Sequence, residues 1–507
     1  MPTPRFFLPE RPSMSKLRAQ AKDLQQRARD GSVDALELLR ELAGHVPGSA
    51  VPLHLAQLAL ARAYGFSGWP RLVRHLDLVS VLRRDPDPGP TRGTDGRADP
   101  VDQFLRLALL SYTEHDRPDQ RQRAAELLAH HPDLPGRSLH VAAATGDAAA
   151  VRRHLAVDPD PTRPAGPWRL SPLLHLCYSR VGVPDADWSG TLDALLDAGA
   201  DPDDGYLWQG LGTPFTALTG LFGEGEQGAV NQPEHPAAFA LARRLLTAGA
   251  DPNDGQVLYN RMFRPSDDHL QLLFEFGLGT GDGGSWHRRL PEVTDDPAGL
   301  LEVQLAWAVT HRMPDRVRLL AGHGVPIDRP LRRGYGAGNL TPVQLAARIG
   351  DPGMVRLLVD LGAPASDDPV STALAVLLDG DGTAIAALDP AVVTGLRRTH
   401  PSLVLRAAVN DRPDVVTALV GLGWDVNAYG RQDAPIEEKW ETALHHAAGE
   451  GKADLARHLL ALGADPTLTD RRFSATPAGW AAHLGHPDLA AALEQAVRDR
   501  QQRGSGR

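Results

Sequence analysis

The residues with the clearest potential for chemistry are the glycines of Gly279–Gly284, which satisfy the G-x-G-x-x-G pattern of a dinucleotide-binding loop. In that role the loop must follow a strand and open a helix, where backbone amides hold the phosphates. Here His269–Phe276 precedes the loop with the apolar spacing of a helix. We therefore interpret Gly279–Gly284 as a turn. Asp379–Gly382 resembles the start of a calcium loop but lacks the later glutamate, so it is also predicted to be a turn.

Metal and nucleophile chemistry would draw on the 20 histidines and the single cysteine, Cys177. His130-His131 and His445-His446 are adjacent pairs, and neighbours on a helix point in different directions, so neither pair can hold one ion. A zinc knuckle would need more cysteines, and no H-E-x-x-H, P-loop or G-x-S-x-G motif occurs in the sequence. Cys177 is expected to be a small buried thiol. The sequence thus predicts no catalytic residue, no cofactor and no metal.

Charge and composition narrow the class of partner. The net charge is −10. Residues 1–90 contain 13 Lys and Arg and 9 Asp and Glu, whereas residues 91–507 contain 40 Lys and Arg and 54 Asp and Glu. An acidic majority disfavours non-specific nucleic-acid binding. No apolar run approaches the roughly 18 residues of a membrane span, and the N-terminus lacks a signal-peptide pattern. With one cysteine and more arginine than lysine, we expect a cytoplasmic bacterial protein.

The segment Glu441–Asp470 predicts the element that would position any functional side chain. Thr442 can cap a short helix with an apolar face, and a second helix with leucines at helical spacing ends at Gly463. Asp465-Pro466 then turns the chain out of helix. A single helix pair of this kind cannot bury its apolar faces, so it needs copies on either side.

Copies of this pattern recur, and the segment resembles an ankyrin repeat, whose T-P-L-H-x-A helix start repeats about every 33 residues. The helix exit Gly463–Pro466 recurs as Gly199–Pro202 and Gly249–Pro252. The resemblance implies an α-solenoid of about eleven repeats, some degenerate, over residues 101–497. It also implies that the signature histidines make structural hydrogen bonds to the next repeat. The residues assigned to the structural signature are His140, His175, Thr341, Thr442, His445 and Gly463.

The predicted organisation is all-α. It comprises an N-terminal helical module at residues 1–83, a Pro/Gly/Asp-rich flexible linker at 84–100, the ankyrin-type array at 101–497 and a disordered basic tail at 498–507. Residues 55–76 resemble a short helical module found ahead of ankyrin arrays in bacterial proteins. Its Tyr64, Phe66 and Trp69 form either a partner-binding cluster or, as we favour, an aromatic mini-core. An insertion is expected around Gly223–Pro236, with no role assigned.

Binding residues are expected in the turns between repeats, because ankyrin-like turns project as fingers and do not need bulky side chains for folding. Tyr, Trp and Arg dominate protein-binding hot spots. The alternative is that these rings pack against neighbouring fingers while the arginines pair with nearby carboxylates. The candidates are Tyr206, Trp208, Arg332, Arg333, Tyr335, Tyr429, Arg431, Trp440, Arg471 and Arg472.

The function predicted from these patterns is a non-enzymatic scaffold or adaptor that binds an unidentified protein partner, as a monomer. Two alternatives remain. One is a regulator in which the array blocks an enzyme. The other is a transcription-linked protein whose N-terminal module contacts DNA through Arg71 and Arg74, although two positive charges give only weak affinity.

Overall fold

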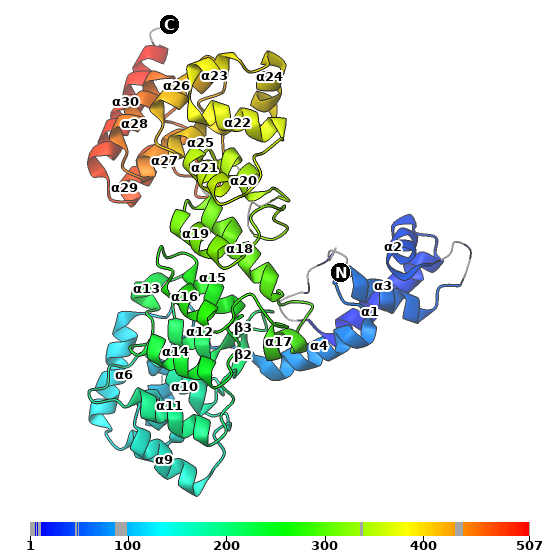
Figure 1. Ribbon diagram of the computed structural model, residues 1–507, viewed down its shortest axis with the longest axis vertical. Coiled ribbons are helices and arrows are strands. Elements are labelled where there is room, and N and C mark those ends of the chain that lie inside the picture. The colour runs from blue at the N-terminus through cyan, green and yellow to red at the C-terminus, as the bar shows by residue number, and fades with distance from the viewer. Residues whose placement is uncertain are drawn as a thin grey trace. The chain divides into compact units, whose positions relative to one another are not determined.

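The computed structural model (Figure 1) describes residues 6, 8, 12–45, 48, 50–86, 99–334, 338–430 and 440–505, with side chains up to residue 502 in the last helix. Within these residues the chain forms 30 helices and three short strands, so it is mostly helical, as the sequence predicts for an all-α protein. The chain divides into two compact parts, Met1–Leu300 and Leu301–Arg507. We call them the N-terminal part and the C-terminal part.

The N-terminal part begins with four helices and a short strand, and continues with pairs of short helices. Its elements are α1 (Met14–Arg29), α2 (Val33–Ala43), α3 (Leu53–Ala63), α4 (Trp69–Leu82), β1 (Arg83–Arg84), α5 (Pro100–Ala108), α6 (Pro118–His130), α7 (Leu134–Arg137), α8 (Leu139–Thr145), α9 (Ala148–Val157), α10 (Pro172–Tyr178), α11 (Trp188–Asp197), β2 (Gly205–Trp208), β3 (Pro214–Thr216), α12 (Ala217–Phe222), α13 (Gly228–Asn231), α14 (Ala238–Thr247), α15 (Gly255–Arg261), α16 (Asp268–Glu275) and α17 (Gly284–Arg289). Helix α18 (Pro297–Thr310) contains the boundary.

Helices α1, α3 and α4 enclose a small aromatic core, while α2 packs in a separate cluster with α1 and α3. Phe66 is buried together with Leu17 and Leu72, while Tyr64 and Trp69 are partly buried against this cluster. Burying such large rings supplies much of the apolar area that a small helical module can remove from water. The three aromatic residues therefore form the mini-core that the sequence favoured.

Strand β1 corrects one expectation. The linker was predicted to be flexible from residue 84, yet Arg83 and Arg84 pair in parallel with Leu207 and Trp208 of β2, which pairs antiparallel with β3. A helix-period pattern carries no sign of such a distant strand pairing, because its partners are more than a hundred residues apart. Residues 87–98, the remainder of the predicted linker apart from its ends, lie outside the described residues.

Short helices stack in register through the rest of the N-terminal part. Helix α8 contacts α10, and α10 contacts α12, while α9 contacts α11 and α11 contacts α14. Serine and threonine start these helices as expected: Ser138 and Ser171 each accept a backbone N–H from three residues ahead. Gly199 and Gly249 end α11 and α14 with φ of 98° and 109°, a backbone that favours glycine.

The insertion predicted at Gly223–Pro236 contains α13 and is anchored by a buried charge. Arg261 is fully buried and pairs with Glu224 at 2.9 Å, Glu234 at 3.0 Å and Asp268 at 3.0 Å. Glu224 and Glu234 belong to the insertion. Because a buried guanidinium needs anionic partners, this network ties the insertion to α15 and to the start of α16.

The C-terminal part continues the pattern of paired helices. Its elements are α19 (Pro314–Gly322), α20 (Pro342–Ile349), α21 (Pro352–Asp360), α22 (Pro369–Asp379), α23 (Gly382–Ala386), α24 (Pro390–Thr399), α25 (Leu403–Val409), α26 (Pro413–Gly421), α27 (Ala443–Gly449), α28 (Ala453–Ala461), α29 (Pro477–His483) and α30 (Pro487–Ser505). Helix α25 contacts α27, and α27 contacts α29, over a core that includes Leu405, Leu444 and Leu459.

Two predicted features of the C-terminal part have clear outcomes. The tail at 498–507 was expected to be disordered, but α30 extends to Ser505, and Arg500 pairs with Asp465 at 3.0 Å. Gly380 and Asp381 form a helix end and the next helix cap, which confirms a turn at Asp379–Gly382. In the described residues no helix has both the length and the apolar character needed to cross a membrane.

Candidate partner-binding surface

The turn that follows α28 is built around one buried carboxylate. Asp470 accepts the backbone N–H groups of Arg472 at 2.8 Å, Phe473 at 2.5 Å and Ala475 at 2.9 Å. It also accepts the indole N–H of Trp480, on α29, at 3.0 Å. With four donors on one carboxylate, the turn from 470 to 475 has a defined conformation and not that of a loose loop.

The charge of Asp470 follows from these contacts. Burial by itself would raise the pKa of this carboxyl group. The hydrogen bonds from Phe473, Trp480 and Ala475 favour the ionised form more strongly, so the pKa of Asp470 lies below its ordinary value. The turn is therefore held by a charged acceptor at neutral pH.

Two arginines leave this turn and lie over aromatic rings. The guanidinium carbon of Arg471 lies 4.3 Å from the centre of the Tyr429 ring, and the Tyr429 hydroxyl donates to the Thr469 carbonyl at 2.8 Å. Arg472 lies 5.8 Å from the Trp440 ring and 5.4 Å from the Phe473 ring. Cation–π contacts of this kind orient a long side chain without neutralising its charge.

Trp440, Phe473 and Trp480 form a group of contacting rings that differ in exposure, and Tyr429 lies beside it under Arg471. Trp440 contacts Phe473 edge-on at 5.8 Å and Trp480 at 5.3 Å. Trp440 is partly buried, whereas 63% of the Phe473 side chain is exposed. The aromatic–arginine surface, as we name it, consists of Tyr429, Trp440, Arg471, Arg472 and Phe473. It combines the residue types that carry most binding energy in protein interfaces.

The candidates of the N-terminal part have a different environment. Tyr206 is 1% exposed and lies against Tyr178 and Phe215, with ring centres 5.7 and 5.8 Å away. Trp208 is partly buried, stacks on Phe215, and donates its indole N–H to the Ser111 carbonyl at 2.8 Å. The alternative interpretation, in which rings pack against neighbouring elements, therefore applies here. Tyr206 is removed from the binding candidates, because its ring is enclosed.

The remaining candidates are separate from the aromatic–arginine surface in the described contacts. Arg332 is exposed and Arg333 half-buried, and the backbone N–H groups of both donate to Glu302. Their turn is thus fixed to α18. Tyr335 and Arg431 lie outside the described residues.

The signature residues hold successive turns together. His140 donates its Nε2–H to the Arg163 carbonyl at 2.8 Å, and His445 donates to the Ala475 carbonyl at 3.1 Å. Each carbonyl belongs to the turn that precedes the next helix pair. His175 differs, because its Nδ1–H donates to Ser171 within its own helix. Burial lowers the pKa of all three histidines, so they are neutral hydrogen-bonding groups at neutral pH.

The other signature residues occupy helix ends. Thr341 accepts the Gln344 N–H at 3.2 Å, and the Gln344 side chain accepts the Thr341 N–H at 2.9 Å, which is a capping box. Thr442 donates its backbone N–H to Nδ1 of His445 at 3.3 Å. Gly463 follows α28 with φ of 97°. These residues position the turns but do not offer side chains to a ligand.

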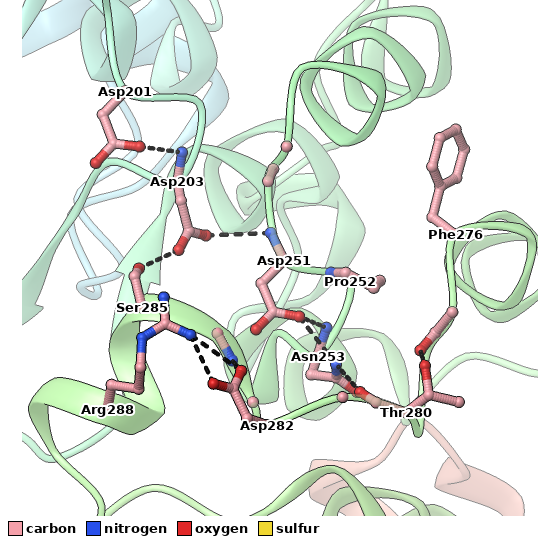
Figure 2. A pocket seen from close by; sticks show the side chains of 16 residues that line it. Asp201, Asp203, Asp251, Pro252, Asn253, Phe276, Thr280, Asp282, Ser285 and Arg288 are labelled. Atoms are coloured by element: carbon pink, nitrogen blue, oxygen red, sulfur yellow. Dashed lines mark hydrogen bonds and ion pairs between the residues drawn. The ribbon is translucent and has the colours of Figure 1, made fainter.

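The glycine-rich stretch Gly279–Gly284 lines an open hollow of about 370 Å³ (Figure 2). Figure 2 shows Asp203 between Ser285 and Asp251, with both hydrogen-bonded to its carboxylate. The Arg288 guanidinium donates to the two carboxylate oxygens of Asp282, at 3.0 and 2.9 Å. Because several aspartates surround the loop, a dinucleotide phosphate would meet like charge there. Residues 279–283 form a turn, as the sequence predicts, and Gly284 begins α17; the stretch follows helix α16 and not the strand that a dinucleotide-binding loop requires.

Two features that the sequence raised for chemistry are Cys177 and the residue types that bind metal ions. Burial raises the pKa of the Cys177 thiol well above its ordinary value, so it is not a thiolate at neutral pH. In the described ranges no group of three or more His, Cys, Asp or Glu side chains has an arrangement that could hold a metal ion.

Phe473 is the one member of the aromatic–arginine surface that the sequence interpretation did not select. A signal was present, because an aromatic residue follows two arginines in a turn that needs no large side chain. Its exposure could not be read from the sequence, since the same residue type is buried elsewhere, at Phe66 and Phe222.

Comparison with known proteins identifies a family resemblance in the part of the chain that carries this surface. No curated protein matches the chain. The family model of the ankyrin repeat matches residues 439–471, which include α27, α28, Trp440 and Arg471. The helix pair beneath the aromatic–arginine surface is therefore similar to an ankyrin repeat.

Proposed function

We propose that this chain is a non-enzymatic scaffold or adaptor that binds another protein through its C-terminal aromatic–arginine surface. An ankyrin repeat indicates protein–protein interaction in general, and residues 439–471 match that family. The observation that carries the proposal is the exposed turn at Arg471–Phe473, rigid around Asp470 and stacked on Tyr429 and Trp440. An exposed ring alone would be ordinary, but an exposed ring beside two arginines and a tryptophan combines the residue types that dominate protein-binding hot spots.

The proposal extends the repeat to an array over residues 101–497, of about eleven units. Support comes from the stacked helix pairs in both parts, from serine and threonine caps, and from the recurring exits at Gly199, Gly249 and Gly463. Such an array would act through shape and fixed side chains, without a reaction step. With a single buried cysteine, it suits a reducing compartment such as a bacterial cytoplasm.

The DNA-binding alternative depended on two exposed arginines, and one of them is paired with a carboxylate. Arg71 pairs with Glu292 at 2.5 Å, which leaves Arg74 as the exposed member of the predicted pair. One positive charge on a helix gives little affinity for phosphates. A regulator that blocks an enzyme remains a special case of protein binding, and the same experiment tests it.

The test is affinity capture from host lysate with the full-length protein, quantified by mass spectrometry. The variant carries Arg472→Ala and Phe473→Ala, two exposed side chains whose removal leaves the Asp470 contacts in place. The matched control is Val157→Ala, because Val157 is 88% exposed and lies in the N-terminal part. Circular dichroism must first show that all three proteins are equally folded.

We expect a partner protein that the wild type and Val157→Ala capture and that the double variant does not. If all captured proteins bind the double variant as well as the wild type, the surface is not where the chain binds, and the proposal fails.

A further inference from the structure

We propose that the partner segment recognised by the aromatic–arginine surface is an acidic peptide, extended and rich in aspartate or glutamate, with an apolar side chain beside the acids. This inference rests on the proposed protein-binding function and adds the chemistry of the partner. Four observations on the surface lead to it: the state of its two arginines, their stacking, the exposed ring and the rigidity of the turn.

The charge of Arg471 and Arg472 is not neutralised by a carboxylate in the described residues. Several other arginines of the C-terminal part do have a carboxylate partner: Arg412 pairs with Asp414 at 2.6 Å, and Arg500 pairs with Asp465 at 3.0 Å. Arg457 likewise pairs with Asp454. Among the described residues Arg397 and Arg398 are also adjacent arginines without a carboxylate partner, so the feature that distinguishes Arg471 and Arg472 is their contact with aromatic rings.

The stacking makes these arginines suitable for carboxylate recognition. Tyr429 lies under Arg471, while Trp440 and Phe473 flank Arg472, so both guanidinium groups are held near defined positions. A ring supplies no oxygen acceptor, and the structure gives neither group a hydrogen bond to a described residue. Their N–H donors can therefore meet the two oxygens of a carboxylate, the geometry for which arginine is best suited.

The exposed ring gives the expected ligand its apolar component. Phe473 is 63% exposed beside Arg472, and Trp440 lies behind it. A ligand that carried only charge would leave this apolar area in water. A peptide with a leucine or phenylalanine next to its acids would cover the ring while its carboxylates reach the arginines.

The rigid turn reduces the entropy that binding would otherwise lose. Asp470 fixes the backbone N–H groups of Arg472, Phe473 and Ala475, so the side chains leave from a defined backbone. A surface that is ordered before binding keeps more of its interaction free energy as affinity.

A nucleic acid also offers anions and rings, but the whole chain disfavours it. The net charge of −10 repels both kinds of anion, but it disfavours a long polyphosphate more than a short peptide with a few carboxylates, because the repulsion grows with the charge of the ligand. The experiment therefore includes a nucleic-acid probe as a competing outcome.

The test uses the full-length protein and fluorescence anisotropy at two salt concentrations. The main probe is a labelled peptide in which glutamates alternate with leucine and phenylalanine. A second peptide has glutamine in place of every glutamate, and a third probe is a single-stranded oligonucleotide of the same net charge as the first peptide. The variants are Arg471→Gln with Arg472→Gln, and Arg471→Lys with Arg472→Lys. The control, Arg457→Gln with Arg498→Gln, removes two exposed positive charges from the same part of the chain.

We expect the wild type to bind the glutamate peptide at least about tenfold more tightly than the glutamine peptide, since each charge-assisted pair contributes enough for that factor. The glutamine variant should lose this preference and the charge-matched control should keep it. The lysine variant should retain only part of it, because lysine lacks the planar fork.

Equal binding of both peptides to the wild type, or tighter binding of the oligonucleotide, would overturn the inference. These results leave the proposed function intact if the lysate capture still yields a partner that depends on Phe473. Failure of that capture, by contrast, refutes the protein-binding function itself, so the two failures are distinguishable.

Discussion

The turn that holds Tyr206 and Trp208 and the turn that holds Arg471 and Phe473 both follow a Gly-Ala-Asp-Pro helix exit, at Gly199 and at Gly463. In the first, strands β2 and β3 bring Tyr206 onto Phe215, and Tyr112 and Tyr178 close the cluster. In the second, the carboxylate of Asp470 accepts the backbone N–H groups of the turn, and the side chains of Arg471, Arg472 and Phe473 are exposed.

The difference shows what decides whether a turn binds or packs. The exit motif sets where the turn begins, and it is the same in both cases. The aromatic side chains of other elements decide the outcome, because Tyr178 and Phe215 contact the Tyr206 ring, which is 1% exposed, whereas Phe473 stays 63% exposed despite its contact with Trp440. Bulky residues in a turn are therefore candidates for binding only where no other element encloses them.

The largest expected effect is that of Tyr206→Ala. Removing a fully buried aromatic ring should lower the free energy of unfolding by about 3–5 kcal/mol, since the cluster cannot collapse into the space. Urea unfolding of the full chain, with hydrogen exchange at residues 205–216, measures it. A loss below about 1 kcal/mol would mean that Tyr206 is not packed as described and that the two turns are alike.

The second largest effect is expected from acidification, which should destabilise the region of the Arg471–Phe473 turn more than the region of the Tyr206 turn. Burial lowers the pKa of His446 to about 4 from an ordinary 6.5, and His446 lies in α27, whose neighbour His445 is hydrogen-bonded to the exposed turn at Ala475. The unfolded chain then binds the proton first, so stability is full above pH 6.5 and is lost as the pH falls to about 4, by up to ~3 kcal/mol. The depressed pKa of Asp470 acts in the same direction.

Near the turn that holds Tyr206, the pKa shifts of the buried groups have opposite effects on stability. Burial lowers the pKa of His175 to about 3, but it raises the pKa values of Asp203 and Asp254 to about 6. A raised carboxyl pKa adds stability as the pH falls from about 6 towards 3.8, which offsets the histidine. Hydrogen exchange at pH 7 and pH 4.5 should show faster opening at 470–475 than at 205–216. Equal acceleration would contradict this assignment.

Local signals in the sequence predicted much of this architecture. Ser138 and Ser171 mark helix starts, and Gly199, Gly249 and Gly463 mark helix ends, because caps and left-handed glycines depend on a few neighbouring residues. The mostly helical class followed from those signals.

What the sequence could not predict depends on distant partners. The pairing of Arg83 with Leu207 and the burial of Tyr206 both involve elements more than twenty residues away in the chain, with no local pattern to announce them. For the same reason, the sequence predicts only part of the candidate binding surface. Arg471 and Trp440 were selected by type, whereas Tyr206 was selected by the same rule and is enclosed.

A smaller effect is expected from Asp470→Ala, which removes the acceptor but no residue of the surface. The lost hydrogen bonds to Arg472, Phe473 and Ala475 should cost about 1–3 kcal/mol, and the freed N–H groups can turn to water. Hydrogen exchange at 471–475 should accelerate, and the affinity for a captured partner should fall. Unchanged affinity with faster exchange would show that rigidity of the turn is not needed for binding.

The smallest effect on stability, and the sharpest contrast with Tyr206, is expected from Phe473→Ala. Its ring is 63% exposed, so truncation should change the free energy of unfolding by less than about 0.5 kcal/mol. Partner capture should nevertheless fall, because the ring that a ligand would cover is gone. Urea unfolding and capture are measured on the same protein, with Val157→Ala as the exposed control. A stability loss of about 2 kcal/mol or more would show that Phe473 is a packing residue like Tyr206. In that case the exposed and the enclosed turn would serve the same structural purpose, and the argument for a binding surface at Arg471–Phe473 would no longer hold.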